Sequence, residues 1–204
     1  MIDKPGWSLY QNRPSFALGF HGTDQRVADG AISGGTHLMR SENTYDWLGN
    51  GIYFWESDPQ RGLEWAQHGH AKGAINDPGL VGAILDLGLC LDLTTRTALD
   101  EVARAYDLLI SSYASSGNMP PVNSGGPDLL KRALDCEVIE ALHGYRYQRG
   151  LPSYDAVRAP FLEDSPLYPG AGFRARNHIQ IAVRNIACIK GYFRPIQDAS
   201  PWGV

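Results

Sequence analysis

Two short segments of the chain carry the residue types best suited to binding chemistry. They are Phe20-His21-Gly22-Thr23, which ends an apolar run, and Gly49-Asn50-Gly51-Ile52-Tyr53-Phe54. The imidazole of His21 can hydrogen-bond a sugar hydroxyl, and Gly22 lets the backbone approach a carboxamide closely. The ring of Tyr53 can stack on a flat heterocycle. Together the two segments predict a site that holds a dinucleotide.

The same two segments resemble the first two motifs of the diphtheria-toxin/PARP-like (H-Y-E) branch of ADP-ribosyltransferases. The resemblance implies that NAD is bound as a substrate, that no metal takes part, and that the cofactor is held by His21, Gly22, Thr23, Gly51 and Tyr53. Tyr53 is expected to stack on nicotinamide. Cleavage of the nicotinamide–ribose bond develops positive charge on the ribose, so such a site acts through positioning and electrostatics.

The third motif of that family is a glutamate near the start of a late strand, and this chain departs from it. The matching strand is Asn177–Val183, and Gln180 falls at the glutamate position. Glutamine can hydrogen-bond a ribose hydroxyl but carries no charge to stabilise the cation. Glu163 is the candidate to supply that charge, with a solvated loop carboxylate as the alternative. The catalytic residues implied are therefore Gln180, Tyr53 and Glu163.

Three interpretations of Gln180 stay open. Transfer of ADP-ribose survives with glutamine, or the chain binds NAD or ADP-ribose without catalysis, or Gln180 orients the acceptor rather than the ribose. Purely structural roles are also open, in which His21 and Gln180 satisfy backbone groups and Tyr53 packs in the core. An NAD glycohydrolase, which uses water as the acceptor, is a further alternative function.

The stretch Pro166–Asn177 lies just before the late strand, where the family meets its acceptor. It mixes aromatic and basic side chains, namely Tyr168, Phe173, Arg174 and Arg176. Such a mixture suits a nucleic-acid base and phosphate, an NAD pyrophosphate or an acidic protein surface. The expected activity is mono-ADP-ribosyl transfer to a protein or nucleic acid. Small enzymes of this branch often act as toxins, so an antitoxin partner is expected by analogy.

The elements that must position these residues indicate an α+β fold. Apolar segments predict strands over Phe16–Phe20, Ile52–Trp55, Leu80–Leu93, Ala156–Leu162, His178–Arg184 and Cys188–Phe193. Capping residues and helical spacing predict helices from Thr23 or Asp24 to Ala31, and over Asp58–Lys72, Thr94–Ser112 and Pro127–Tyr147. The resemblance implies one catalytic domain over residues 1–204, with a split β-sandwich core, flanking helices and a helical insertion over 94–150. Residues 1–15 are expected to form an arm.

Composition limits the class of protein. The 18 basic and 22 acidic residues give a net charge of −4, which does not favour indiscriminate nucleic-acid binding. Cys90, Cys136 and Cys188 lie in apolar segments and are predicted to be buried thiols, as a reducing cytosol allows. Neither a signal-peptide pattern nor an apolar run of about 18 residues is present. A cytoplasmic protein without membrane association is expected.

Overall fold

The structure is a computed structural model that describes residues 16–196, so the arm predicted over residues 1–15 lies outside it. The fold is α+β, as the sequence predicts. In chain order the elements are β1 (Ala17–Asp24), α1 (Gln25–Ile32), β2 (Ile52–Glu56), α2 (Pro59–Ala71), β3 (Pro78–Leu85), β4 (Cys90–Asp92), α3 (Arg96–Ser116), α4 (Ala133–Gln148), β5 (Ala156–Phe161), β6 (His178–Val183), the short 3-10 helix η2 (Ile186–Cys188) and β7 (Ile189–Phe193).

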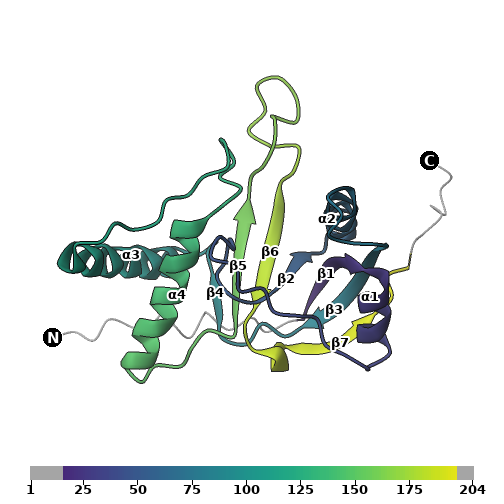
Figure 1. The fold of residues 1–204 in the computed structure, drawn as a ribbon, viewed down its shortest axis with the longest axis horizontal. Helices are drawn as coiled ribbons and strands as arrows, with labels where there is room; N and C mark the ends of the chain where they lie inside the picture. The colour runs from purple at the N-terminus through teal and green to yellow at the C-terminus, as the bar shows by residue number, and fades with distance from the viewer. Residues whose placement is uncertain (1–15, 197–204) are drawn as a thin grey trace.

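The strands of the described region form one seven-stranded sheet in the order β4-β5-β6-β2-β1-β3-β7. All neighbouring pairs in it are antiparallel except β4 and β5. Helices α3 and α4 pack on each other at the β4–β5 end, whereas α1 and α2 lie at the β1–β3–β7 end (Figure 1). The helices are therefore divided between the two ends of the sheet.

The sheet is nearly divided in its middle, where β1 meets β2. β1 pairs with β3 along all of Ala17–Asp24, but it pairs with β2 only at Gly19–Glu56 and Phe20–Trp55. A further hydrogen bond runs from the Ser57 amide to the Leu18 carbonyl. From His21 onward, β1 continues along β3 while its ladder with β2 has ended. A gap therefore opens between the two segments that the sequence marks for chemistry.

Two hydrophobic clusters occupy opposite sides of the sheet. One includes Phe54, Val81, Leu85, Ile181 and Val183, and the other includes Leu91, Leu109, Leu142, Val157 and Ala182. Successive residues of β6 point to opposite sides, so Ile181 and Ala182 enter different clusters. Because hydrophobic clusters cover both sides of the sheet at this strand, β6 ends in the unbroken apolar run Ile181-Ala182-Val183. Each large buried aliphatic side chain stabilises the fold by about 1.5–3 kcal/mol.

A buried arginine ties three strands on the Phe54 side of the sheet. Arg158 of β5 forms ion pairs with Glu56 of β2 and with Asp92 of β4. The Arg158 Nη1 to Asp92 Oδ1 distance is 3.2 Å, and both side chains are largely buried. A charged group that is removed from water needs a partner of opposite charge. The carboxylates of Glu56 and Asp92 therefore allow the Arg158 guanidinium to be buried against the sheet.

Local capping explains where the predicted helices begin. Asp58 accepts a hydrogen bond from the Arg61 amide at 3.0 Å, and Pro59 occupies the first helical position of α2. Asp24 and Thr95 cap α1 and α3 in the same way. Helix α3 runs past the predicted end at Ser112, to Ser116. It stops where Gly117 adopts a left-handed backbone conformation, with a φ of 70°.

The structure corrects three predicted boundaries. β1 extends past Phe20 to Asp24, because β3 pairs with it throughout. The segment Leu80–Leu93 forms two strands rather than one, divided at Gly88, where φ is +54°. Helix α4 begins at Ala133 rather than Pro127, because the side chain of Asn123 accepts hydrogen bonds from the Leu134 and Asp135 amides.

Two further expectations concern the cysteines and the helices. All three cysteines are buried, as predicted. Within residues 16–196, none of the helices has the length and apolar character needed to cross a membrane.

A buried histidine in α4 makes stability depend on pH. His143 is 6% exposed, and within residues 16–196 neither of its ring nitrogens has a hydrogen-bond partner. Burial lowers its pKa from 6.5 to about 3, and the positive charge of Arg184 acts in the same direction. The ring is therefore neutral in the folded chain, where it packs edge-on against Tyr154.

Replacing His143 with leucine is expected to reduce the loss of stability on acidification. The unfolded chain takes up a proton on this residue near pH 6.5 and the folded chain only near pH 3, so stability falls as the pH drops between these values. The slope from this one group is at most about 1.4 kcal/mol per pH unit. Urea unfolding at pH 7 and pH 5 measures it, with the exposed His68→Gln variant as control. Equal pH dependence of His143→Leu and the unchanged protein would contradict the account.

Candidate functional site

His21 lies where β1 and β2 separate, and its side chain spans the gap. Its Nδ1 atom is 2.7 Å from the carbonyl oxygen of Tyr53. A carbonyl oxygen can only accept, so Nδ1 carries the proton and donates. Burial lowers the pKa of His21 below 6.5, so the ring is neutral at pH 7 and Nε2 remains an acceptor. An acceptor nitrogen at this position suits a ribose hydroxyl.

Gly22 is required for packing between β1 and α2. A Cβ atom at this position would lie 1.9 Å from the carbonyl oxygen of Gly62 and 3.1 Å from the amide nitrogen of Ala66. The two backbones therefore touch directly. The glycine that the sequence assigns to ligand binding is thus explained first by helix packing.

The peptide groups of Gly22 are nevertheless turned toward the gap. In an antiparallel sheet, alternate residues direct their N–H and C=O groups to the same neighbouring strand. The carbonyl of Leu18 accepts from Ser57 on the β2 side, so Phe20 and Gly22 face that side as well. The ladder with β2 ends at Phe20. Gly22 therefore presents a donor and an acceptor along the open edge, as binding of a carboxamide requires.

Tyr53 has a fixed ring and an occupied hydroxyl. The hydroxyl accepts from the Leu48 amide at 2.8 Å and donates to the Gly49 carbonyl at 2.7 Å. Burial raises the pKa of Tyr53 well above its usual range. The hydroxyl is therefore held by the preceding loop and stays protonated, which leaves the face of the ring as the part able to contact a ligand.

The two remaining residues of the predicted NAD site have mainly backbone roles. The amide and carbonyl groups of Gly51 both bond to Ser41, at 3.1 and 2.8 Å. A Cβ atom on Gly51 would lie 3.0 Å from the carbonyl of Val183, so glycine allows β2 to approach β6. Thr23 continues β1 opposite Gly79 of β3. Gly51 thus shapes the site and offers no free peptide group.

Gln180 and Glu163 belong to one buried polar chain. The side-chain nitrogen of Gln180 is 3.1 Å from Nε2 of His178, and Nδ1 of His178 is 3.5 Å from Oε2 of Glu163. The same carboxylate oxygen is 3.0 Å from Nη2 of Arg61 on α2. Glu163 is 8% exposed, so it is not a solvated loop carboxylate. Arg61 already balances its charge.

The strand register decides which side chains share a side of the sheet. Tyr53 pairs with Ala182 and Trp55 pairs with Gln180, so the side chains of Tyr53, Trp55 and Gln180 point to the same side. His21 belongs by its register to the opposite side, where its ring centre lies 5.8 Å from that of Phe54. The structure thus brings His21 to the backbone of Tyr53 rather than to its ring.

Sequence reasoning did not name Arg61, His178 or Trp65 as site residues. Trp65 of α2 is 55% exposed, and its ring centre lies 5.8 Å from that of the buried Trp55. It adds an aromatic surface on the same side as Tyr53. Nothing local in the sequence marks Arg61, because its partner Glu163 lies 102 residues away. His178 could have been found, since it precedes Gln180 on the same face of the predicted strand.

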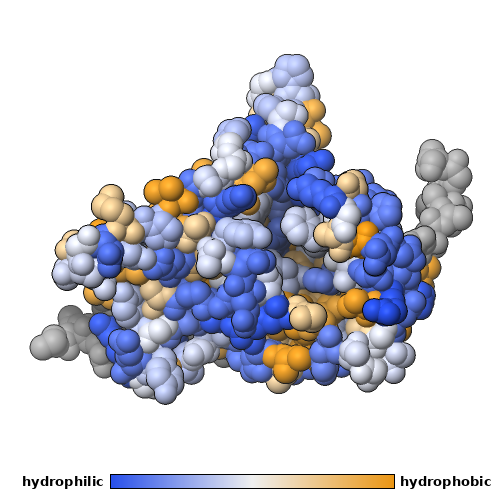
Figure 2. Space-filling view, in the orientation of Figure 1, coloured by the Kyte–Doolittle hydropathy of each residue, from blue (hydrophilic) through white to orange (hydrophobic). Residues whose placement is uncertain are grey.

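Two surface cavities lie against α3 and α4. One of about 390 Å³ is bordered by Arg104, Leu108 and Arg149, and one of about 610 Å³ by Trp47, Tyr106 and Phe161. Neither is lined by a predicted site residue. The candidate site instead follows the open edge of β1, and Figure 2 shows the surface hollowed beneath the projecting hairpin. In the described region, no group of three or more His, Cys, Asp or Glu side chains is arranged to hold a metal.

Comparison of the chain with protein families, with curated proteins and with solved structures found no match.

Replacing Gly22 with alanine is expected to destabilise the fold by about 1–3 kcal/mol, because the added carbon meets backbone that cannot rotate away. Gly144→Ala in α4 is the matched control. A Cβ there meets nothing within 4 Å, and alanine favours a helix by up to about 1 kcal/mol. Urea unfolding measures both variants. A Gly22→Ala protein as stable as the original would contradict the packing described.

Proposed function

We propose that this chain is a mono-ADP-ribosyltransferase that cleaves NAD and transfers ADP-ribose to a macromolecular acceptor. One observation carries the proposal. At the gap between β1 and β2, the neutral imidazole of His21 joins the two sequence segments that resemble the family's motifs, and it keeps Nε2 as an acceptor. The near division of the sheet at this point fits the split core of that family. We place the reaction in the cytoplasm.

The proposed binding mode assigns one group of the protein to each part of NAD. The peptide groups of Gly22 hold the carboxamide, and the ring of Tyr53 stacks on nicotinamide. Nε2 of His21, whose ring lies toward the other side of the sheet beside Phe54, accepts from the adenosine-side ribose across the gap between β1 and β2. The carbonyl oxygen of Gln180 accepts from the 2′-hydroxyl of the nicotinamide ribose. Arg61 neutralises Glu163, so little negative charge faces the developing cation. Loss of such a charge in a dry site costs a few kcal/mol, so slow turnover is expected.

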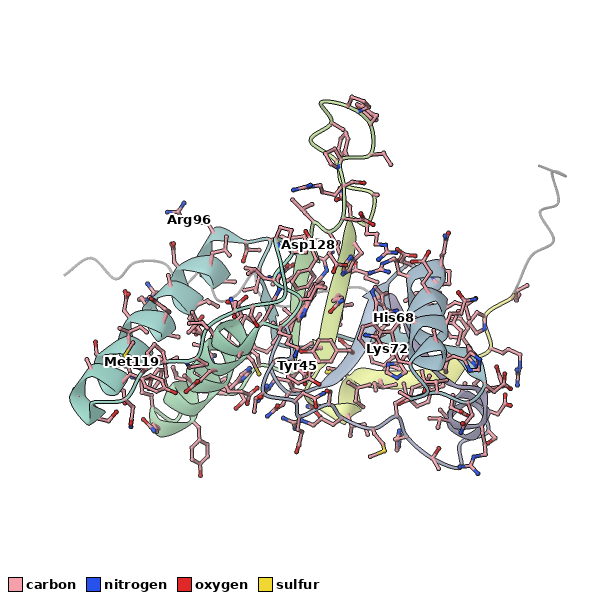
Figure 3. All side chains as sticks on the ribbon, turned by 45° about the horizontal axis from the view of Figure 1, so that its top comes forward. Tyr45, His68, Lys72, Arg96, Met119 and Asp128 are labelled. Atoms are coloured by element: carbon pink, nitrogen blue, oxygen red, sulfur yellow. The ribbon has the colours of Figure 1, made fainter. Side chains whose placement is uncertain are left out.

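We assign binding of the acceptor to the hairpin of residues 162–177. This hairpin lies between β5 and β6 and projects from the body of the protein (Figure 1). Its base is fixed by a hydrogen bond from the Asp164 amide to Asp128, which lies beside it in Figure 3. Arg174 donates to the Asp164 carbonyl, and Arg176 lies 3.4 Å from the Asp164 carboxylate. Leu167, Tyr168 and Phe173 are 60%, 56% and 61% exposed.

These features favour a protein acceptor over a nucleic acid. Nucleic-acid binding relies on cations that neutralise several phosphates, and both arginines of the hairpin are engaged with Asp164. Exposed apolar side chains at a projecting tip suit an apolar protein surface. The antitoxin partner expected by analogy stays a prediction.

The test uses NAD labelled in its adenylate part, incubated with the protein and a whole-cell extract. We expect nicotinamide release, with label entering the protein fraction. Gln180→Ala is expected to lower the release rate by about 10- to 1000-fold, because it removes a contact to the reacting ribose. The exposed Gln148→Ala on α4 is the control and should leave the rate unchanged.

Each other outcome identifies an alternative. Binding of NAD without release supports a silent NAD-binding module, and release without labelled macromolecule supports a glycohydrolase. Label that enters the RNA or DNA fraction, and not the protein fraction, would show that the acceptor is a nucleic acid rather than a protein. Absence of both binding and release contradicts the proposed function.

A further inference from the structure

The amide of Gln180 has a donor end and an acceptor end, and its neighbour decides which way it faces. Nδ1 of His178 is 2.9 Å from the Arg176 carbonyl, which can only accept, so Nδ1 carries a proton. In a neutral imidazole the other nitrogen, Nε2, is then an acceptor. Gln180 lies 3.1 Å from that nitrogen, so it must turn its NH2 group toward His178.

The surroundings of His178 favour the neutral ring. Its side chain is fully buried, and its ring packs against Phe161 and Trp47, with ring centres 5.5 and 6.3 Å away. The charged groups that face it are Glu163 at the base of the hairpin, and Arg61 with Asp58 from α2. Burial lowers the pKa of His178, while Glu163 opposes that effect and Arg61 reinforces it. Because Glu163 is already paired with Arg61, it does not require a proton on His178.

We propose that His178 is a positioning residue that holds the Gln180 amide with its carbonyl oxygen turned away, available to a hydroxyl donor of the ligand. This rests on the proposed function for the identity of the ligand, but not for the geometry of the pair. Glutamine is then the residue that fits a neutral His178. A carboxylate at position 180 would place one acceptor against another, unless His178 took up a proton.

The pair is tested first by NMR of the imidazole nitrogens, without NAD. The unchanged protein is expected to show the Nδ1–H tautomer of His178. In Gln180→Glu the pKa of His178 is expected to rise by about one unit or more, because the imidazolium gains a carboxylate partner. Gln148→Glu, on the exposed end of α4, should leave that pKa unchanged. An Nε2–H tautomer in the unchanged protein, or an unmoved pKa in Gln180→Glu, would overturn the proposal.

The second test measures NAD binding by calorimetry in two variants of His178. His178→Gln keeps an acceptor for the Gln180 amide and is expected to bind within about threefold of the unchanged protein. His178→Leu removes the acceptor and is expected to weaken binding by about tenfold, which corresponds to one hydrogen-bonded group. Urea unfolding confirms that both variants fold.

The two tests separate the possible failures. If His178→Leu binds NAD as tightly as the unchanged protein, the positioning role is wrong. If the unchanged protein does not bind NAD, the proposed function fails, and the tautomer and pKa measurements still decide the geometry of the His178–Gln180 pair.

Discussion

The fold and the candidate site both depend on the separation of β1 from β2, which begins after the residue pair Phe20–Trp55. The two strands share only two residue pairs, and beyond them the hydrogen bond from the His21 imidazole to the Tyr53 carbonyl replaces the backbone ladder. That side-chain bond holds the two halves of the sheet at a fixed separation. It leaves the peptide groups of Gly22 along an open edge, which is unusual at the centre of a sheet, where backbone groups are otherwise paired.

Helix α2 connects the two sides of this gap. Its Gly62 packs directly on Gly22 of β1, and its Arg61 reaches Glu163 at the base of the projecting hairpin. Through His178 the same buried chain continues to Gln180. Removing one partner of a buried ion pair costs about 3–5 kcal/mol, so α2, the hairpin and β6 are expected to keep their relative positions. The candidate site is therefore held by contacts between segments distant in the sequence.

Local signals in the sequence predict much of the fold. Asp58 followed by Pro59 marks the start of α2, and alternating or apolar runs mark β2, β5 and β6. Long-range pairing has no local signal. β1 extends to Asp24 because it pairs with β3 along its whole length. Helix α4 begins at Ala133 because the side chain of Asn123, ten residues earlier, accepts a hydrogen bond from its first turn. For the same reason the motif residues could be named, whereas the Arg61–Glu163 pair, 102 residues apart, could not.

We propose that NAD lies along the open edge of β1 and reaches β6. A titration with NAD, followed by NMR of the Gly22 backbone amide and the Gln180 side-chain amide, tests it most directly. Both signals are expected to shift together, with one dissociation constant, while the signal of the exposed Gln148 amide stays unchanged. Saturation with NAD that moves neither the Gly22 nor the Gln180 signal would contradict it.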